Sequence, residues 1–435
     1  MCKFVPRSHK KAIRCLLVFV SFCLWPGIKC IAADTHYVSL SGTNNSPYLN
    51  WADAATQIQW AVDASTAGDT VLVSNGTYYL TNQINIAVAI TTTSVNGRNV
   101  TIVDGNYPGY TNRCFYLTNA TLDGFTVRNG HDTNDLAGGI YAVTGAKIQN
   151  CRIISNNAFR VSKDGGKGVY LNASTISNCD VVGNFNGGIG AYVGASVLNC
   201  VVASNVVAPT NGAPSSREAH GGGIAAYDVG TIINACTVYG NSNNTAGYGN
   251  CFGGGVLLGF GASLRNSLVY NNNAKLGGGV SQYSSSCTVK NCTIVSNYAT
   301  SAAGGIYLSC PNLKTAYVEN VICYFNISGS GSNLATYSTG TFYIVNSCIA
   351  PTNDFPTNGI AGYYYANNIQ SNPQFVDKDT GNWRLKVNSP CINSGTNEAW
   401  MTGAFDLDGH LRIHYGTVDM GAYETIYNGT VYRIP

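Results

Sequence analysis

The chain has 435 residues, of which only 10% are charged, and it is rich in Gly (50 residues) and Tyr (28 residues). Its formal net charge of +3 arises in the first 33 residues; the remainder carries 18 basic against 21 acidic side chains. This balance excludes a strongly basic surface for nucleic acid, and the absence of helical heptads favours an all-β repeat protein over an α/β enzyme.

Residues 1–33 have the pattern of a secretory signal peptide. Basic residues are concentrated in residues 1–14, the apolar run CLLVFVSFCLW follows, and Ala32 and Ala33 provide small residues for cleavage. The alternative is a membrane anchor, but the run is too short to span a bilayer comfortably. We therefore expect a secreted, periplasmic or cell-surface protein without a membrane span after cleavage.

The next segment predicts a capped beginning of a β structure. The stretch TQIQWAVDASTAGD (Thr56–Asp69) places Ile58, Ala61 and Val62 at helical spacing. The stretch DTVLVSNGTYYL then predicts a strand, a turn and a second strand. Because the open ends of a stacked sheet must be covered, we interpret the helix as an N-terminal cap.

Two short phrases then alternate along the chain. One phrase, as in AKIQNCRIISN, ASVLNCVVASN and CTVKNCTIVSN, ends in Asn; the other is a Gly-Gly pair that leads into a short β run. A unit of about 28 residues on average cannot bury its own apolar face, so its copies must stack. We predict an all-β fold, a right-handed parallel β-helix, with the hand taken from the general rule for parallel crossovers.

Stacking places equivalent residues above one another, roughly 4.8 Å apart. We expect the Asn positions to form a ladder of side-chain amides and the positions five residues earlier to form an inward column of small residues. The Asn column comprises Asn129, Asn156, Asn184, Asn205, Asn241, Asn272, Asn297 and Asn326. The small-residue column comprises Gly124, Cys151, Cys179, Cys200, Cys236, Ser267, Cys292 and Val321. The cysteines lack zinc-site spacing, and we expect most of them to stay reduced.

Three stretches resemble known families. Residues 37–78 (YVSLSGTN to SNGTY) resemble the entry segment of secreted pectin-lyase-like β-helix proteins. The alternating phrases resemble the repeats of polymorphic outer membrane proteins. Residues 372–424, with NPQFVDKDTGNWRL, DLDGHLRI and VDMGAYE, resemble the C-terminal module of bacterial choice-of-anchor Q proteins. These resemblances imply an exported β-helix protein without a defined chemistry. We expect a signal peptide at 1–33, a capped β-helix at 34–355 and a C-terminal module at 356–435.

The loops that follow the Asn column indicate a candidate site. The long ones, GHDTNDLA, NAFRVSKD and VVAPTNGAPSSREAH, carry most of the charge and should project from one edge of the stack. They supply the candidate catalytic residues His131, Asp132, Lys163, Asp164, Glu218 and His220, and the candidate binding residues Arg160 and Arg217. The nearby strands supply candidate sugar-binding tyrosines, namely Tyr141, Tyr170, Tyr192 and Tyr227.

Three interpretations of this rim remain open. A lyase would neutralise a uronate with Arg217 or with Ca²⁺ on Asp132, Asp135 and Asp164, and would use Lys163, His131 or His220 as the base. A hydrolase would need two facing carboxylates from Asp132, Asp164 and Glu218. Alternatively, the charges only keep an Asn-rich rod soluble, and the absence of the polygalacturonase and pectate lyase motifs favours this third interpretation.

The C-terminal DLDG stretch is a second candidate site. Asp406, Asp408 and Asp419 offer carboxylates for Ca²⁺, although an EF-hand loop is not present. We favour the alternative that Asp406 or Asp408 pairs with Arg412. The preferred function is that of a secreted protein, expected to be monomeric, which binds an extracellular polysaccharide and, in one alternative, cleaves it. The other function considered is a non-catalytic adhesin or structural rod.

Overall fold

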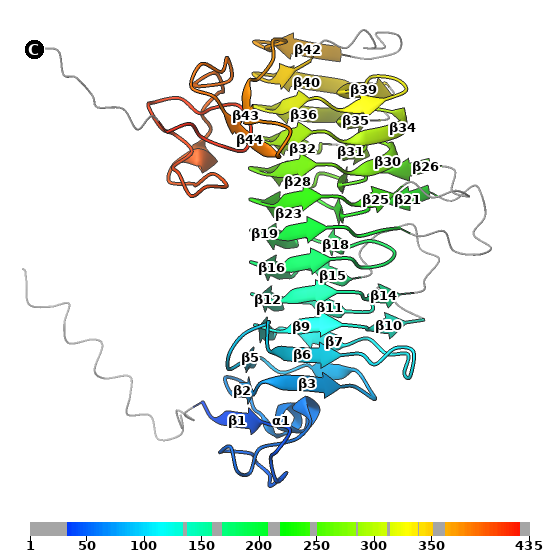
Figure 1. Ribbon diagram of the computed structural model, residues 1–435, viewed down its shortest axis with the longest axis vertical. Coiled ribbons are helices and arrows are strands. Elements are labelled where there is room, and N and C mark those ends of the chain that lie inside the picture. Colours follow the sequence, from blue (N-terminus) through cyan, green and yellow to red (C-terminus); the bar gives the residue numbers. More distant parts are fainter. Residues whose placement is uncertain are drawn as a thin grey trace, which may run out of the picture.

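The computed structural model describes residues 33–133, 137–158, 168–207, 218–243, 250–283, 286–310, 314–337, 339–350 and 362–426. They form a tall stack of coils with three long parallel sheets along its sides (Figure 1). Each complete coil contributes one strand to each sheet, which we call sheets A, B and C. The predicted parallel β-helix is confirmed.

Sheet A has thirteen strands, and every neighbouring pair is parallel. They are β1 (Thr35–Val38), β2 (Thr70–Val73), β5 (Thr91–Ser94), β8 (Thr121–Asp123), β12 (Lys147–Gln149), β16 (Thr175–Ser177), β19 (Ser196–Leu198), β23 (Ile232–Asn234), β28 (Ser263–Arg265), β32 (Thr288–Lys290), β36 (Thr315–Glu319), β40 (Thr341–Val345) and β42 (Gly362–Ala366). Strand β42 still belongs to this sheet although it follows residue 356.

Sheet B has eleven strands and sheet C has ten. Sheet B consists of β3 (Gly76–Tyr79), β6 (Thr101–Asp104), β9 (Thr126–Arg128), β13 (Arg152–Ile154), β17 (Asp180–Val182), β20 (Val201–Ala203), β24 (Thr237–Tyr239), β29 (Leu268–Tyr270), β33 (Thr293–Val295), β37 (Ile322–Tyr324) and β41 (Cys348–Ile349). Sheet C consists of β4 (Ile84–Ile86), β7 (Phe115–Thr118), β11 (Ile140–Val143), β15 (Val169–Asn172), β18 (Ile189–Tyr192), β22 (Ile224–Tyr227), β27 (Val256–Gly259), β31 (Val280–Tyr283), β35 (Ile306–Ser309) and β39 (Leu334–Tyr337).

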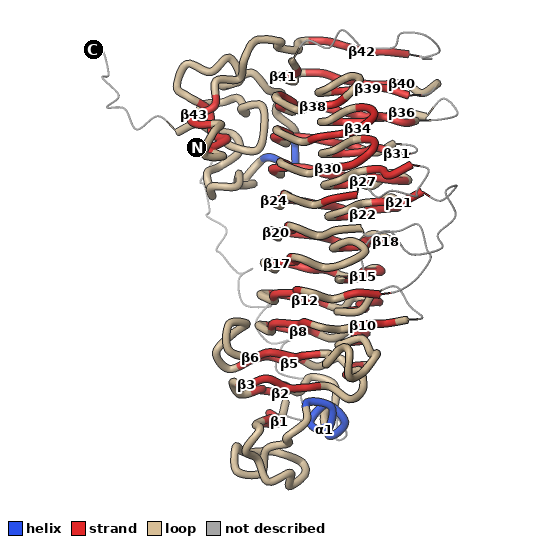
Figure 2. The backbone as a smooth tube through the Cα atoms, turned by 45° about the vertical axis from the view of Figure 1, so that its right-hand side comes forward, coloured by secondary structure: helices blue, strands red, loops and turns tan. Residues whose placement is uncertain are grey.

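Short extra strands lie in the connections from sheet B to sheet C (Figure 2). One pair is β10 (His131–Asp132) with β14 (Asn157–Ala158). A further parallel sheet, which we call the edge sheet, consists of β21 (Glu218–His220), β26 (Asn250–Phe252), β30 (Asn273–Leu276), β34 (Tyr298–Ala302) and β38 (Ile327–Ser328), with β25 (Ser242–Asn243) beside β30.

The core follows from alternation along each short strand. In one coil, Ile140, Ile148 and Ile153 from sheets C, A and B all point inward and are fully buried. The three corners of this coil are made by Thr144, Asn150 and Ser155, each with a positive φ between 49° and 57°. Such single left-handed residues turn the chain sharply between strands, and Asn is one of the residue types that tolerates them best.

The predicted Asn ladder is confirmed from Asn156 to Asn326. From Asn184 onward, each Oδ1 accepts both the backbone N–H and the side-chain Nδ2 of the Asn one coil earlier, as Asn241 Oδ1 does from Asn205 at 3.0 and 2.9 Å. Asn129 was wrongly included, because it occupies the left-handed corner position that Ser155 occupies one coil later. The ladder ends on Asn333, whose Oδ1 accepts from Asn326 at 3.1 Å.

The predicted column of small residues is buried, and it also forms hydrogen bonds. Cys179 Sγ accepts the backbone N–H of Cys151 at 3.2 Å, and Ser267 Oγ accepts the N–H of Cys236 at 3.1 Å. None of Cys151, Cys179, Cys200, Cys236 and Cys292 is in a disulfide. The column therefore supplies acceptors to backbone groups at the corner between sheets A and B.

Both ends of the rod have additional structure. Helix α1 (Ile58–Ala64) buries Ile58, Ala61 and Val62 against the first coil, as the sequence predicts. At the other end, residues 369–424 pack on the outer face of sheet B, with β43 (Phe375–Asp377), β44 (Asn382–Leu385) and the 3₁₀ turn η1 (Ala399–Met401). Figure 1 shows this orange and red module beside the upper coils. Among the residues described, no helix has the length and apolar character needed to cross a bilayer.

Candidate functional site

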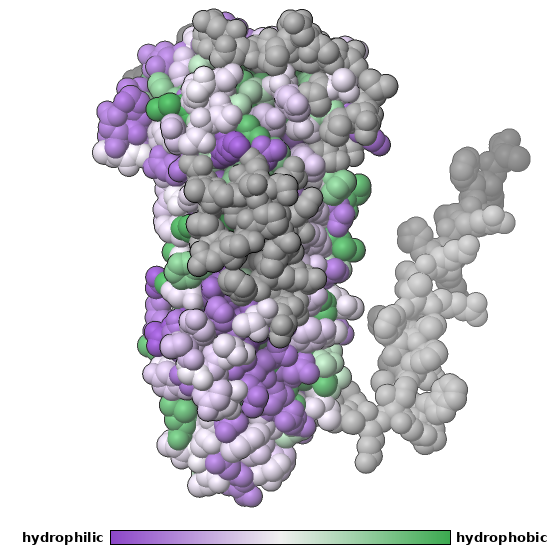
Figure 3. Space-filling model, turned by 90° about the vertical axis from the view of Figure 1, so that its right-hand side faces the viewer, coloured by the Kyte–Doolittle hydropathy of each residue, from purple (hydrophilic) through white to green (hydrophobic). Residues whose placement is uncertain are grey.

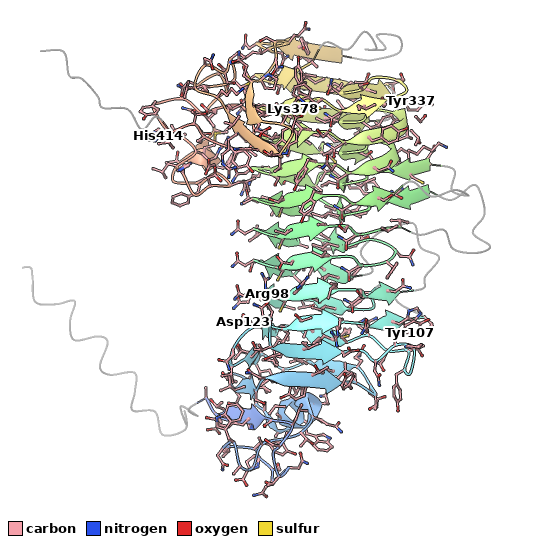
Figure 4. All side chains as sticks on the ribbon, viewed as in Figure 1. Arg98, Tyr107, Asp123, Tyr337, Lys378 and His414 are labelled. Carbon is pink, nitrogen blue, oxygen red and sulfur yellow. The ribbon has the colours of Figure 1, made fainter. Side chains whose placement is uncertain are left out.

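The connections from sheet B to sheet C form one side of the rod, which we call the B–C edge. Strands β10 and β14 pair across successive coils, so His131 lies beside Asn157 and Asp132 beside Ala158. Tyr107 and Tyr337 lie on this side of the molecule (Figure 4). The coloured surface of this side is mostly hydrophilic to neutral, with small separate hydrophobic patches (Figure 3).

Several predicted site residues cannot be placed. Asp135, Arg160, Lys163, Asp164 and Arg217 lie outside the described residues. Glu218 begins strand β21, but its side chain is not among those described. The facing carboxylates of a hydrolase, the calcium ligands and the lysine base of a lyase therefore stay predictions.

The predicted tyrosines form one continuous stack on the outer face of sheet C. The ring centroids of Tyr141, Tyr170, Tyr192 and Tyr227 follow one another at 4.8, 4.9 and 5.3 Å, and Tyr116 precedes them at 5.4 Å. Interplanar angles of 24° or less mean that the ring faces contact each other. A ligand beside the stack would therefore meet ring edges and phenol groups, rather than the open ring faces that we expected for sugar binding.

Strand register explains the stack and shows what the sequence reasoning missed. Tyr116, Tyr141 and Tyr170 occupy the same position in three successive strands. At the next coil that position is Gly190, and Tyr192 lies two residues later yet still stacks on Tyr170. Tyr116 in the phrase CFYLTN has the same spacing as Tyr141, so the register alone would have identified it.

A buried arginine lies beside the beginning of the stack. The Arg113 guanidinium is 4.8 Å from the centroid of the Tyr141 ring and makes a 2.8 Å ion pair with Asp132. It also donates to the Ala137 carbonyl at 2.7 Å and to Gln83 Oε1 at 3.1 Å. Asp132 is thus held by a buried cation, which disfavours its predicted roles as a free nucleophile or calcium ligand. Sequence reasoning missed Arg113, because only the burial of this isolated residue reveals its role.

His131 is the predicted base that the described structure supports best. Its ring stacks on Tyr107, with centroids 4.1 Å apart and an interplanar angle of 13°. Partial burial lowers the pKa of His131, and the neighbouring Asp132 only partly opposes this effect. The imidazole is consequently neutral at neutral pH, the state in which it can accept a proton.

His220 has a different environment. Its Nδ1 lies 2.5 Å from the Tyr227 hydroxyl, and both side chains are buried. Phe252 and Tyr283 surround the ring at centroid distances of 5.9 and 5.7 Å. We therefore interpret His220 as part of an aromatic cluster between sheet C and the edge sheet, rather than as a base at an open surface.

The C-terminal acidic group is a bonded structural unit. Asp406, Asp408 and His410 could bring ligand atoms within 4.8 Å of one another. However, both Asp406 oxygens accept backbone N–H groups, and both Asp408 oxygens accept from Arg384. The expected partner of Arg412 was wrong: its guanidinium lies 3.1 Å from a carboxyl oxygen of Glu424. A calcium ion would have to displace these bonds.

Comparisons with known proteins give the fold. No family model and no curated protein match the chain. A crystal structure of the pectate lyase Pel9A matches with a TM-score of 0.50 and 16% identity, covering 90% of this chain and 97% of that one. A rhamnogalacturonan lyase matches with a TM-score of 0.47 and 14% identity, covering 87% and 95%. The A-module of the Azotobacter vinelandii mannuronan C-5 epimerase AlgE4 gives 0.39 and 12%, covering 72% and 91%. The chain thus has the right-handed parallel β-helix fold seen in the pectate lyase.

Proposed function

We propose that this protein binds a polysaccharide outside the cell, with the sugar chain lying lengthwise along the rod where the outer face of sheet C borders the B–C edge. The tyrosine stack is the observation that carries the proposal. It runs through five successive coils, from Tyr116 to Tyr227, and its first four rings are partly exposed. Coils repeat at roughly 4.8 Å, so Tyr116, Tyr141 and Tyr170, which share one register, offer a row of phenol groups beside an extended glycan. The hydroxyl groups of Tyr192 and Tyr227 are buried and do not extend this row.

Two further features support a carbohydrate ligand. The fold is shared with a protein named as a pectate lyase, whose ligand is a polysaccharide by its name. The low charge of the chain suits a ligand that is recognised through hydroxyl groups as well as through charge. Secretion, which the N-terminal pattern predicts, would place the protein where such polymers occur.

The binding proposal is tested with residues 34–435 and immobilised neutral and acidic polysaccharides. A variant with Tyr116→Phe, Tyr141→Phe and Tyr170→Phe, three residues that share one register, keeps the rings and removes three hydroxyl groups. If each hydroxyl contributes about 1 kcal/mol, the Kd should rise by about two orders of magnitude. Tyr343→Phe with Tyr364→Phe is the matched control, because these rings stack at 4.4 Å on sheet A. Equal affinities of both variants and the parent would refute the proposal.

Cleavage by a lyase is the second candidate function, and His131 is the observation that favours it. A neutral imidazole next to the ion pair of its chain neighbour Asp132 has the chemistry to remove a proton next to a uronate carboxylate. Unsaturated uronide absorbance should then appear with the parent protein and vanish with His131→Ala. If the protein binds the polymer but produces neither new absorbance nor new reducing ends, cleavage is refuted, and the non-catalytic adhesin alternative is supported.

A further inference from the structure

A hollow of about 490 Å³ lies at the N-terminal end of the B–C edge. One wall comes from helix α1 and the two residues before it, and the other comes from β3 and the segment that leads to β4. We propose that this hollow is a binding subsite for a neutral sugar unit. The inference rests on the proposed function, because it treats the hollow as the end of the same glycan-binding edge.

Two exposed aromatic side chains line the hollow. Trp60 of α1 is 38% exposed, and Tyr79 at the end of β3 is 65% exposed. Large aromatic side chains in contact with solvent at a concave surface are suited to the apolar faces of pyranose rings. Within the described part of the chain, neither ring is stacked on another aromatic ring, in contrast to the rings between Tyr141 and Tyr227.

The polar side chains of the hollow are held in place. Gln59 Oε1 accepts the backbone N–H of Asn85 at 2.7 Å, and Gln59 Nε2 donates to Asp63 Oδ1 at 2.8 Å. These bonds fix the Asp63 carboxylate beside the Trp60 wall before any ligand arrives. A preorganised acceptor next to an aromatic face is the combination that a sugar with several hydroxyl donors requires.

The charge of the lining selects the class of sugar. Asp63 is the only Asp, Glu, Lys or Arg among the described residues that line the hollow, and the other polar side chains there are amides, including those of Asn82 and Gln83, and hydroxyl groups. A uronate carboxylate would meet a negative charge there without a cation to balance it. Neutral hexoses or pentoses can instead donate hydroxyl groups to Asp63 and the amides.

The hollow is also connected to the rest of the edge. Gln83 lines it and accepts a 3.1 Å hydrogen bond from Arg113. Arg113 in turn lies over Tyr141, in the tyrosine stack. A glycan lying along the stack would therefore bring its end or a side branch into the hollow. The volume of the hollow suits one or two sugar units.

The test uses residues 34–435, short neutral oligosaccharides built from glucose, galactose, xylose or rhamnose, and galacturonate oligomers of equal length. Binding is measured by calorimetry and by tryptophan fluorescence. Trp60→Ala should weaken binding of the best neutral oligosaccharide at least tenfold, and Tyr79→Ala should weaken it severalfold. Trp51→Ala is the matched control: Trp51 is 43% exposed on the same cap, does not line the hollow and should leave the affinity unchanged.

The outcomes separate this inference from the proposed function. If polymer binding depends on the stack hydroxyls while Trp60→Ala binds neutral oligosaccharides as the parent does, the inference falls and the proposed function stands. If neutral oligosaccharides require Trp60 but the triple Phe variant retains polymer, the stack proposal falls instead. Preferential binding of galacturonate oligomers, or no binding of any neutral oligosaccharide at millimolar concentration, also overturns the inference. Unchanged melting temperatures of the variants confirm that each has folded.

Discussion

Gly223 lies directly against the side-chain amide of Asn241, one coil further along the rod. A Cβ atom on Gly223 would be 2.9 Å from Asn241 Nδ2 and 2.6 Å from the Gly255 carbonyl oxygen. The same relation recurs between Gly188 and Asn205. The two phrases that alternate in the sequence are therefore two halves of one packing unit, in which the glycine of one coil makes room for the asparagine of the next.

Gly223→Ala should destabilise the rod. The added methyl group meets a backbone oxygen, and the segment cannot move away because the Ile224 N–H donates to the Gly255 carbonyl at 2.9 Å. Overpacking of this kind costs about 1–3 kcal/mol of unfolding free energy, measured by urea denaturation. Gly329→Ala is the control, since its nearest Cβ contact is the Ser301 oxygen at 3.4 Å. Equal urea midpoints for the two variants would contradict this packing argument.

Asn241→Ala should be more damaging. Asn241 is 1% exposed, and its Oδ1 is the acceptor for two donors of Asn205. Its removal leaves the buried backbone N–H of Asn205 without an acceptor, at about 1–3 kcal/mol, and removes one of two acceptors of Asn205 Nδ2, which still donates to the Val181 carbonyl at 2.9 Å. Asn96→Ala removes an exposed amide that donates to Asn75 at 3.0 Å, and should cost less than about 0.5 kcal/mol. A similar loss for both variants, again by urea denaturation, would show that the ladder contributes no special stability.

Much of this fold was predictable because the repeat fixes both the side-chain period and the corner positions. The ladder from Asn156 to Asn326 follows from spacing alone. The two ends of the ladder could not be predicted from the spacing. Asn129 is an asparagine, but it occupies a left-handed corner position outside the ladder. Asn333 belongs to the ladder although it comes only seven residues after Asn326. Sequence spacing describes a repeating interior well, whereas the first and last rungs depend on where the repeat stops.

The candidate site was less predictable for a physical reason. The tyrosines were identified because each lies on a strand close to the charged loops, yet their mutual stacking, which closes the ring faces, depends on how each ring tilts toward the next coil. The hollow beside Trp60 arises where α1 approaches the segment before β4, and only the packing of the cap reveals it. The ion pair of Arg113 with Asp132 likewise joins residues from two separate connections.

The cysteine column allows a prediction about substitution by serine. Cys179 Sγ accepts the Cys151 N–H and lies 3.1 Å from the Ser177 carbonyl oxygen, to which it donates. Ser267 makes the equivalent pair of bonds, to the Cys236 N–H and the Arg265 carbonyl. Cys179→Ser should therefore keep the stability within about 1 kcal/mol. Cys179→Val removes the acceptor and should cost about 1–3 kcal/mol. Thermal unfolding would refute this if serine destabilised the protein as much as valine.

The C-terminal module should make the stability dependent on pH through Glu424. Burial raises the pKa of Glu424 from its ordinary value of 4.5 to about 9; Asp419 adds to this effect, and Arg412 opposes it. Between these two values the folded protein holds a proton that the unfolded chain has released. Stability should therefore fall as the pH rises toward 9, by at most about 1.4 kcal/mol per pH unit, and this contribution should level off above 9.

Glu424→Gln isolates this contribution, because the amide keeps a polar oxygen near the Asp419 N–H but cannot ionise. Relative to the parent, the variant should gain stability steadily from pH 6 to pH 9, and the difference should then stay constant up to pH 10. Urea midpoints at each pH measure it. Parallel curves for the two proteins would mean that Glu424 is ionised in the folded state at neutral pH, with Arg412 dominating over burial.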